Sequence, residues 1–404
     1  MAQGAMRLLR TNPALRAVVA SRLVSSVGTW LAYVALTVDV YTRTHSSVWV
    51  SAVLLADFLP TIAVASLAGP WLDRLPRRTL LIGSELAAGL VFVALPFAPD
   101  ATAIVGLALC AGIASAVFFP TVRAALPSLV DERDLPRANA LSQTVATSGM
   151  AAGPVLAGLL VASSGVDTAY ALNAASFVAS AALLAQLPAL GQASTGDGGG
   201  YWREAAAGLR VCLETPALRM VVRVWVIASL GGAVINVGEI FLARQAFHAG
   251  TFGFGLLATA GGTGIAAGSV LASRITADTA TAALRIGLAV AALGFGAAAL
   301  SPNVWTAASC ALVAGGGNAV FLAASTLMLQ RSAEEAVRGR AFAIFDAAGV
   351  TAIAVGMATG GAIVGALGAR GAWAAAAGAI AVAGLSSLSR RSVARVPRPE
   401  PQPS

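Results

Sequence analysis

Five acidic residues lie inside long apolar stretches of this sequence, where an isolated charge is costly: Asp39, Asp57, Glu85, Glu239 and Asp346. Burial favours the neutral form of a carboxyl group, so an acid exposed in turn to two aqueous compartments can carry a proton between them. Asp57 is the first candidate for this role because it lies near the middle of its stretch. The alternative is a permanent ion pair with Arg22 or another buried cation. Glu85 and Asp346 lie near the ends of their stretches, and we expect them to brace a gate.

Asp39 and Glu239 also lie near the ends of apolar stretches. Each is followed within five residues by an arginine, Arg43 or Arg244. Either acid could carry a proton. We favour a gate in which each acid pairs with its own arginine, because these positions are close to water.

Polar residues recur every three or four positions in the first apolar stretch, as they do on one face of a helix: Arg22, Ser26, Thr29 and Tyr33. We predict that they line a substrate cavity together with Asn236 of the seventh stretch, because a polar stripe avoids lipid. For the hydroxyl groups alone, hydrogen bonding between helices is the favoured alternative. A mainly apolar cavity with a few polar groups suits an amphiphilic small molecule.

The composition shows what kind of molecule must position these residues. The chain has 404 residues, of which 57% are hydrophobic and 11% are charged, and this excludes a soluble globule with a polar surface. We predict an all-α membrane protein with twelve transmembrane helices in two pseudo-symmetric six-helix bundles. A span needs about 20 residues. The twelve predicted spans cover approximately residues 17–41, 47–68, 79–97, 101–125, 138–161, 168–187, 218–243, 252–272, 282–300, 304–329, 341–367 and 371–388.

The arginines predict the orientation of the chain. All 26 basic residues are arginines, and on this assignment 22 of them lie on one side of the membrane, three lie on the other, and Arg22 lies inside the first span. The positive-inside rule then places both termini in the cytoplasm. The lack of lysine and the abundance of alanine and glycine suggest a GC-rich bacterial genome, so we expect the chain in the inner or plasma membrane of a bacterium. The arginines are spread over many loops, so nucleic acid is not an expected partner. His45 and His248 have no metal-ligand neighbours, so we expect no metal, no cofactor and no enzymatic activity.

The two halves of the chain resemble each other at an offset of about 200 residues. Residues 39–43 match residues 239–244, and residues 136–140 match residues 337–341. Chance similarity between alanine-rich segments is the alternative, but parallel repeats of this kind place a cavity between two bundles. We predict an N-terminal bundle at 1–190, a cytoplasmic hinge and amphipathic connector at 191–216, a C-terminal bundle at 217–389 and a disordered basic tail at 390–404.

A short loop after the second span combines glycine, acid and arginine: Gly69, Asp73, Arg74, Arg77 and Arg78. The spacing resembles the G-x-L-x-D-R-x-G-R-[RK] motif of the major facilitator superfamily, with Trp71 and Pro76 in place of the leucine and the second glycine. This resemblance and the repeat arrangement imply a cytoplasmic gate, in which Asp73 caps the start of the eleventh span near Arg340. The alternative is that the acid only neutralises the arginines of its own loop.

The fifth span has small residues around a proline: Gly149, Gly153, Pro154 and Gly158. Small residues four or five positions apart give a flat face for close helix packing, and the proline bends the helix. The pattern resembles the G-x-x-x-G-P-x-x-x-G motif of the superfamily's exporters, with Ala157 in place of a usual glycine. In those proteins the motif is associated with antiport. General helix packing is the alternative explanation.

Four further segments resemble the enterobactin-exporter-like branch of the superfamily: residues 21–28, 119–127, 134–140 and 337–340. Members of that branch export siderophores, antibiotics or other small metabolites. Many drug/proton antiporters carry an arginine in the fourth span, but residues 101–119 contain no basic residue. Proton coupling must therefore use other groups.

We therefore predict a monomeric secondary active transporter. It would export an amphiphilic drug, siderophore or secondary metabolite by alternating access, in exchange for protons. The alternatives are an importer or facilitator of a small metabolite and a non-transporting membrane scaffold or sensor. Asp57 argues against a scaffold, because a scaffold needs no acid in a cavity. The expected partners are the substrate, protons and the lipid bilayer.

Overall fold

The structure is a computed structural model that describes residues 2–64, 75–188 and 201–388. Several sequence predictions therefore lie outside the described residues: those for Gly69, Asp73 and Arg74 of the loop motif, for the hinge at 191–200 and for the tail at 390–404.

The first half of the described chain begins with a helix that the sequence analysis did not predict, α1 (Ala2–Thr11). The remaining helices follow the predicted spans: α2 (Pro13–Thr44), α3 (Ser47–Ala63), α5 (Arg77–Ala94) with the 3-10 turn η2 (Leu95–Phe97), α6 (Ala101–Ala125) and α7 (Leu135–Leu184). Two of them start at capping residues. Asn12 Oδ1 accepts a hydrogen bond from the Leu15 amide, and Asp100 Oδ1 accepts one from the Ala103 amide, each at 2.9 Å.

The second half begins with α8 (Tyr201–Glu214), which lies within the segment 191–216 predicted to hold the hinge and amphipathic connector. It continues with α9 (Pro216–Phe241), the π-helix η6 (Leu242–Ala246), α10 (Gly250–Ala272), α11 (Ala280–Leu300), α12 (Val304–Ser332) and α13 (Glu335–Ser386). α12 is capped at its start by the Asn303 side chain, which accepts from the Trp305 and Thr306 amides.

The two longest helices each contain one glycine with a non-helical backbone. Gly165 in α7 has φ 83° and ψ 172°, and Gly368 in α13 has φ 70° and ψ 173°. This left-handed region favours glycine, so each residue can turn the chain between two spans. The two glycines occupy corresponding places in the halves, at an offset of about 200 residues.

The number of membrane-crossing segments agrees with the prediction. Within the described residues, nine helices are long and apolar enough to cross a membrane. Counting α7 and α13 as two segments each and adding the shorter α3 gives the twelve predicted spans.

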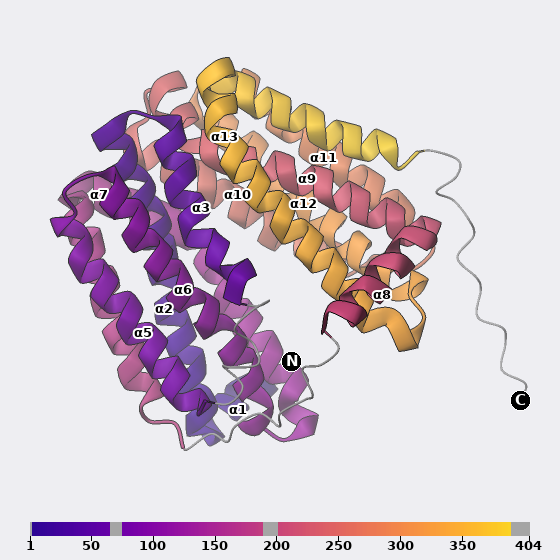
Figure 1. Cartoon of the computed structure of the whole chain (residues 1–404), viewed down its shortest axis with the longest axis horizontal. Helices are drawn as coiled ribbons and strands as arrows, with labels where there is room; N and C mark the ends of the chain where they lie inside the picture. Colours follow the sequence, from indigo (N-terminus) through magenta and orange to yellow (C-terminus); the bar gives the residue numbers. More distant parts are fainter. Residues whose placement is uncertain (1, 65–74, 189–200, 389–404) are drawn as a thin grey trace, which may run out of the picture.

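The helices form two groups that are in contact at one end of the molecule (Figure 1). The first group holds α2, α3, α5, α6 and α7, and the second holds α9 to α13. The groups separate toward the end that carries α1 and α8. α8 packs against the start of α13, where Gly208 lies against Arg340 and Ile344. We call the end where the groups meet the closed end and the opposite end the open end.

Candidate transport cavity

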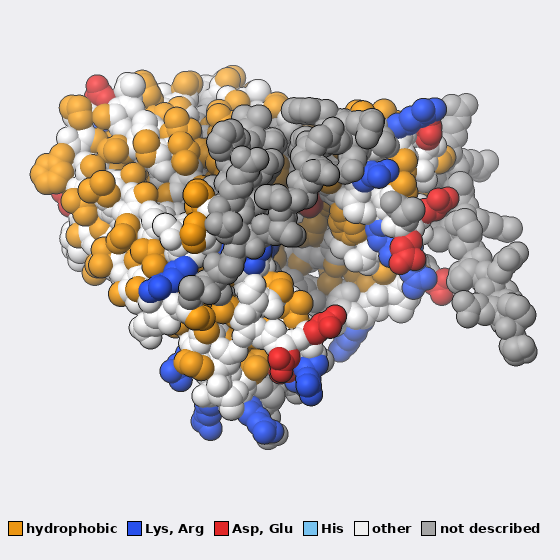
Figure 2. All heavy atoms as spheres, turned by 60° about the horizontal axis from the view of Figure 1, so that its bottom comes forward, with side chains coloured by type: hydrophobic (Ala, Val, Ile, Leu, Met, Phe, Trp, Pro, Cys, Tyr) orange, Lys and Arg blue, Asp and Glu red, His pale blue; other side chains and the backbone are white. Residues whose placement is uncertain are grey.

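A cavity of about 470 Å³ lies between the two halves. It is lined by residues of α2, α3 and α7 from the first half and by residues of α9 to α13 from the second. The space-filling view shows the surface hollowed between the halves, with arginine side chains gathered on the same face (Figure 2). The volume falls in the range of about 300–1,000 Å³ that is usual for small-molecule sites.

Two of the predicted acids line this cavity. Asp57 reaches it from α3, has an exposed side chain, and forms no ion pair with a described residue. The alternative pairing with Arg22 is not formed, because that guanidinium instead donates to Ser142 Oγ at 2.6 Å. Glu239 reaches the cavity from α9, and its Oε2 accepts a hydrogen bond from the Tyr33 hydroxyl at 3.2 Å. The Tyr33–Glu239 bond crosses from one half to the other.

Further hydrogen bonds join the halves at the closed end. Ser47 Oγ donates to the Gly361 carbonyl at 2.6 Å, and Ser51 Oγ donates to the Met357 carbonyl at 2.7 Å. Ser51 Oγ also accepts from the Gly361 amide at 2.6 Å. The first turns of α3 are therefore fixed to the middle of α13. These contacts close the cavity at this end.

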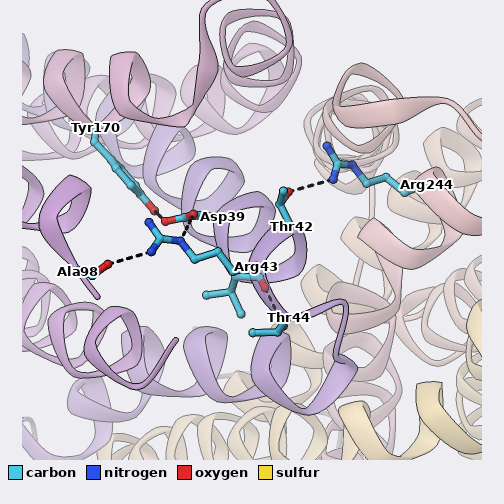
Figure 3. A network of polar contacts seen from close by, with 8 residues as sticks. Asp39, Thr42, Arg43, Thr44, Ala98, Tyr170 and Arg244 are labelled. Atoms are coloured by element: carbon cyan, nitrogen blue, oxygen red, sulfur yellow. Dashed lines mark hydrogen bonds and ion pairs between the residues drawn. The ribbon is translucent and has the colours of Figure 1, made fainter. Parts of the chain in front are cut away.

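The predicted Asp39–Arg43 pair is present at the same end (Figure 3). Arg43 Nε lies 2.7 Å from Asp39 Oδ1, and the Tyr170 hydroxyl donates to Asp39 Oδ2 at 3.1 Å. Arg43 also donates to the Ala98 carbonyl at 2.8 Å. All four residues belong to the first half, so this network holds α2 to its own neighbours.

The corresponding pair in the second half is not formed, and this prediction was wrong. Arg244 instead donates to Thr42 Oγ1 of α2 at 3.1 Å (Figure 3). It also donates to Thr251 Oγ1 at 2.8 Å. Its guanidinium carbon also lies 5.2 Å from the ring centroid of Tyr41. Arg244 lies five positions after Glu239, and the chain between them passes from α9 into the π-helix η6, so the two residues lack the i,i+4 spacing of Asp39 and Arg43. Glu239 therefore lines the cavity, whereas Arg244 contacts Thr42 on α2.

Most of the polar stripe predicted for the first span does not line this cavity. Tyr33 and Asn236 line the cavity as predicted, and Asn236 is exposed there. Arg22, Ser26 and Thr29 are not among its lining residues. Ser26 lies against Gly149 of α7, and the Thr29 hydroxyl donates to the Ser25 carbonyl of its own helix at 2.9 Å. Neither hydroxyl group makes a hydrogen bond to another helix among the described residues, so the alternative of hydrogen bonding between helices stays a prediction for them.

Glu85 is buried inside the first half rather than at an interface between the halves. Glu85 is 2% exposed. Its Oε1 accepts a hydrogen bond from Ser25 Oγ at 3.3 Å, and its Oε2 has no hydrogen-bond partner among the described residues. The surrounding side chains come from α2, α5, α6 and α7. This position does not fit the predicted gate. Asp346 is exposed on α13 and forms no ion pair with a described residue.

The described arginines of the loop motif bond within the first half. Arg77 donates to Ser128 Oγ at 3.2 Å, and Arg78 donates to the Ala185 carbonyl at the end of α7. Arg340 lies in the second half, against Gly208. No hydrogen bond joins these three arginines to a described residue across the open end. Their role in a gate stays a prediction.

The small residues of the fifth span pack against helices of both halves. Gly149 faces Ser26 and Gly153 faces Trp30, both on α2. Gly158 lies against Thr251 and Gly255 of α10, and a side chain on Gly255 would overlap the Pro154 carbonyl. The predicted close packing is therefore present, and it includes a contact between the halves.

Most of the aromatic lining of the cavity was not predicted from the sequence. Seven aromatic residues line it: Trp30, Tyr33, Phe58, Trp225, Phe295, Phe321 and Trp373. A signal was available, because tryptophan in membrane helices is enriched at the membrane–water interfaces. Trp30 and Trp225 lie instead well inside predicted spans. Within the described part of the chain, no group of three or more His, Cys, Asp or Glu residues could hold a metal ion.

Twelve apolar segments surround a cavity between two helical halves, and the match to a family model of the major facilitator superfamily identifies this arrangement as a transporter of that superfamily. The chain belongs to the transmembrane secretion effector family, whose model matches residues 8–398. It is therefore a multi-pass membrane transporter and not an enzyme.

Characterised relatives and solved structures agree with this assignment. The chain is 27% identical over 374 residues to the enterobactin exporter EntS of Citrobacter koseri, which covers 90% of this chain and 87% of the relative. It has a TM-score of 0.75 and 16% identity to a bacterial homologue of the iron transporter ferroportin in its inward-facing state, over 95% of this chain and 99% of that one. An inward-facing, occupied bacterial homologue of the human lysosomal transporter Spinster gives a TM-score of 0.73 at 14% identity, over 92% of this chain and 95% of that one.

Proposed function

We propose that this protein exports an amphiphilic small molecule from the cytoplasm by alternating access, in exchange for protons. The observation that carries this proposal is the cavity between the halves, which polar contacts close at one end. Alternating access requires contacts of this kind, because they must break when the opposite end closes. Export is supported by the relatives named as enterobactin exporters.

The arginine distribution supports an orientation with both termini in the cytoplasm of a bacterial cell. In that orientation the open end of the cavity faces the cytoplasm, and the closed end faces outward. The proposed units are bundles at 1–190 and 217–389 joined by a connector at 191–216, with a tail at 390–404, acting as a monomer. These bounds follow from the sequence pattern.

Asp57 remains our first candidate for carrying the proton, with Glu239 as the second. Both line the cavity, and Asp57 forms no ion pair with a described residue. A carboxyl group in such a cavity can load a proton on one side and release it on the other when the cavity changes the side to which it opens.

Accumulation assays test this function. Cells that express the gene should accumulate less of a transported compound than cells that lack it, and an uncoupler should abolish the difference. Asp57→Asn should abolish uphill export while the purified variant still binds the compound. Higher accumulation in expressing cells would show import instead. Full uphill export by Asp57→Asn would exclude this residue as the proton carrier.

A further inference from the structure

The charged residues that line the cavity all carry the same sign. Asp57 and Glu239 supply two carboxyl groups, and none of the described lining residues is an arginine, lysine or histidine. The acidic lining contrasts with the chain as a whole, which has a net charge of +8 because its 26 arginines outnumber its acidic residues. A ligand that brings a positive charge would compensate the carboxylates, whereas an anion would add a further buried charge of the same sign.

The aromatic residues add a second preference for cations. Trp30 and Tyr33 meet edge to face with ring centroids 5.7 Å apart, and so do Phe295 and Trp373 at 5.8 Å. The face of an aromatic ring carries partial negative charge and attracts a cation, most strongly when water is excluded. The same rings offer flat apolar surface to an aromatic ligand.

Neutral polar groups complete the lining. Ser229 is buried, and its hydroxyl has no hydrogen-bond partner among the described residues. Asn236 is exposed to the cavity, and Asn318 also lines it. These groups can orient a ligand by hydrogen bonding without adding a positive charge to the site.

We propose that the cavity selects an organic cation with aromatic or other bulky apolar groups, whose positive charge is balanced by Asp57 and Glu239. This inference rests on the proposed transport function and narrows its substrate class. A carboxylate or phenolate anion of similar size is disfavoured by the two acids.

Two probes of nearly equal shape and opposite charge test the proposal, namely tetraphenylphosphonium and tetraphenylborate. Binding to the full-length protein in lipid nanodiscs is followed by quenching of tryptophan fluorescence, because Trp30, Trp225 and Trp373 line the cavity. Wild type should bind the phosphonium at least tenfold more tightly than the borate. The double variant Asp57→Asn/Glu239→Gln should lose this preference.

Glu85→Gln is the matched control, because Glu85 is a buried acid that does not line the cavity. This variant should keep the wild-type preference within twofold. If the double variant elutes as an aggregate in size-exclusion chromatography, the single variants Asp57→Asn and Glu239→Gln test the proposal in its place. Each single variant should weaken phosphonium binding more than borate binding.

Equal affinity for the two probes in wild type, or an unchanged preference in the double variant, would overturn the cation proposal. Uncoupler-sensitive export of a neutral or anionic compound together with equal probe affinities would leave the transport function standing. Selective phosphonium binding without uphill transport would instead remove the transport function and keep the cation site.

Discussion

An acid and an arginine lie near the closed end of α2, and a corresponding pair lies near the closed end of α9, but the two pairs make different contacts. Asp39 and Arg43 bond to each other and to Tyr170 within the first half. Glu239 and Arg244 do not bond to each other, and both reach α2 in the other half. The first pair can persist when the halves separate at this end, whereas the contacts of the second pair must break.

The local helix geometry accounts for this difference. Asp39 and Arg43 are four residues apart on an α-helix, so they share a face. One extra residue separates Glu239 from Arg244, and the chain there passes into the π-helix η6. π-Helical turns of this kind often occur at functional sites. Glu239 and Arg244 each contact the other half instead of each other.

The largest expected effect comes from breaking the first pair. Asp39→Ala leaves the buried Tyr170 hydroxyl without its acceptor and Arg43 without its carboxylate. We expect a loss of about 2 kcal/mol in the free energy of unfolding, measured as a lower Tm in detergent. Arg244→Ala is the comparison and should cost less than about 1 kcal/mol. Equal losses in the two variants would show that the pairs do not differ in structural role.

The second prediction concerns the contact between Arg244 and Thr42. Arg244→Ala removes a hydrogen bond that exists only while the halves touch, so the population open at this end should rise about fivefold, which corresponds to about 1 kcal/mol. Spin labels at the exposed positions Thr102 and Gln245, in a variant lacking Cys110, Cys212 and Cys310, report the separation of the halves.

Arg370→Ala is the control for that measurement. Arg370 donates to the carbonyls of Ala299 and Ser301, all in the second half. Its removal should leave the distribution of label distances unchanged. A similar shift in both variants would mean that the arginines act by general loosening and not by joining the halves.

The smallest expected effect is a change in ligand affinity on substitution of Tyr33. Tyr33→Phe removes the donor to Glu239 but keeps the aromatic contacts with Trp30 and Phe254. Because the carboxylate is then free to face a ligand cation, affinity for tetraphenylphosphonium should rise about two- to threefold. A tenfold loss of affinity would show instead that the hydroxyl itself contacts the ligand.

Much of the fold could be predicted from the sequence, because membrane spans are recognisable by their length and apolar composition. The predicted bounds at 101–125 are confirmed by α6, and α8 lies within the predicted connector at 191–216. α1 was not predicted because a helix of ten residues with this polarity is too short to cross a membrane. Gly165 and Gly368 were not singled out, since glycine is frequent throughout the chain.

The site was harder to predict, because periodicity shows which residues share a helix face but not which neighbour that face meets. Arg22, Ser26 and Thr29 share spacing with Tyr33, yet only Tyr33 lines the cavity. The acids Asp57 and Glu239 were found because charge in an apolar span is conspicuous. Aromatic residues that face a cavity have the same hydrophobicity as those that face lipid, so composition alone could not separate them.

The crossing of α7 and α10 has a mechanical consequence. At Gly158, Gly255 and Gly262 the two helices touch through main-chain atoms, and Gly262 lies against the Met150 carbonyl, which lacks its usual helical donor because residue 154 is proline. Two threonine side chains also join the helices here, since Thr259 Oγ1 accepts from the Val155 amide at 2.8 Å and Thr263 Oγ1 donates to the Ala151 carbonyl at 3.3 Å. In the proposed cycle we expect the two helices to pivot at this crossing, because the glycines let the main chains stay in contact while the rest of the halves separate.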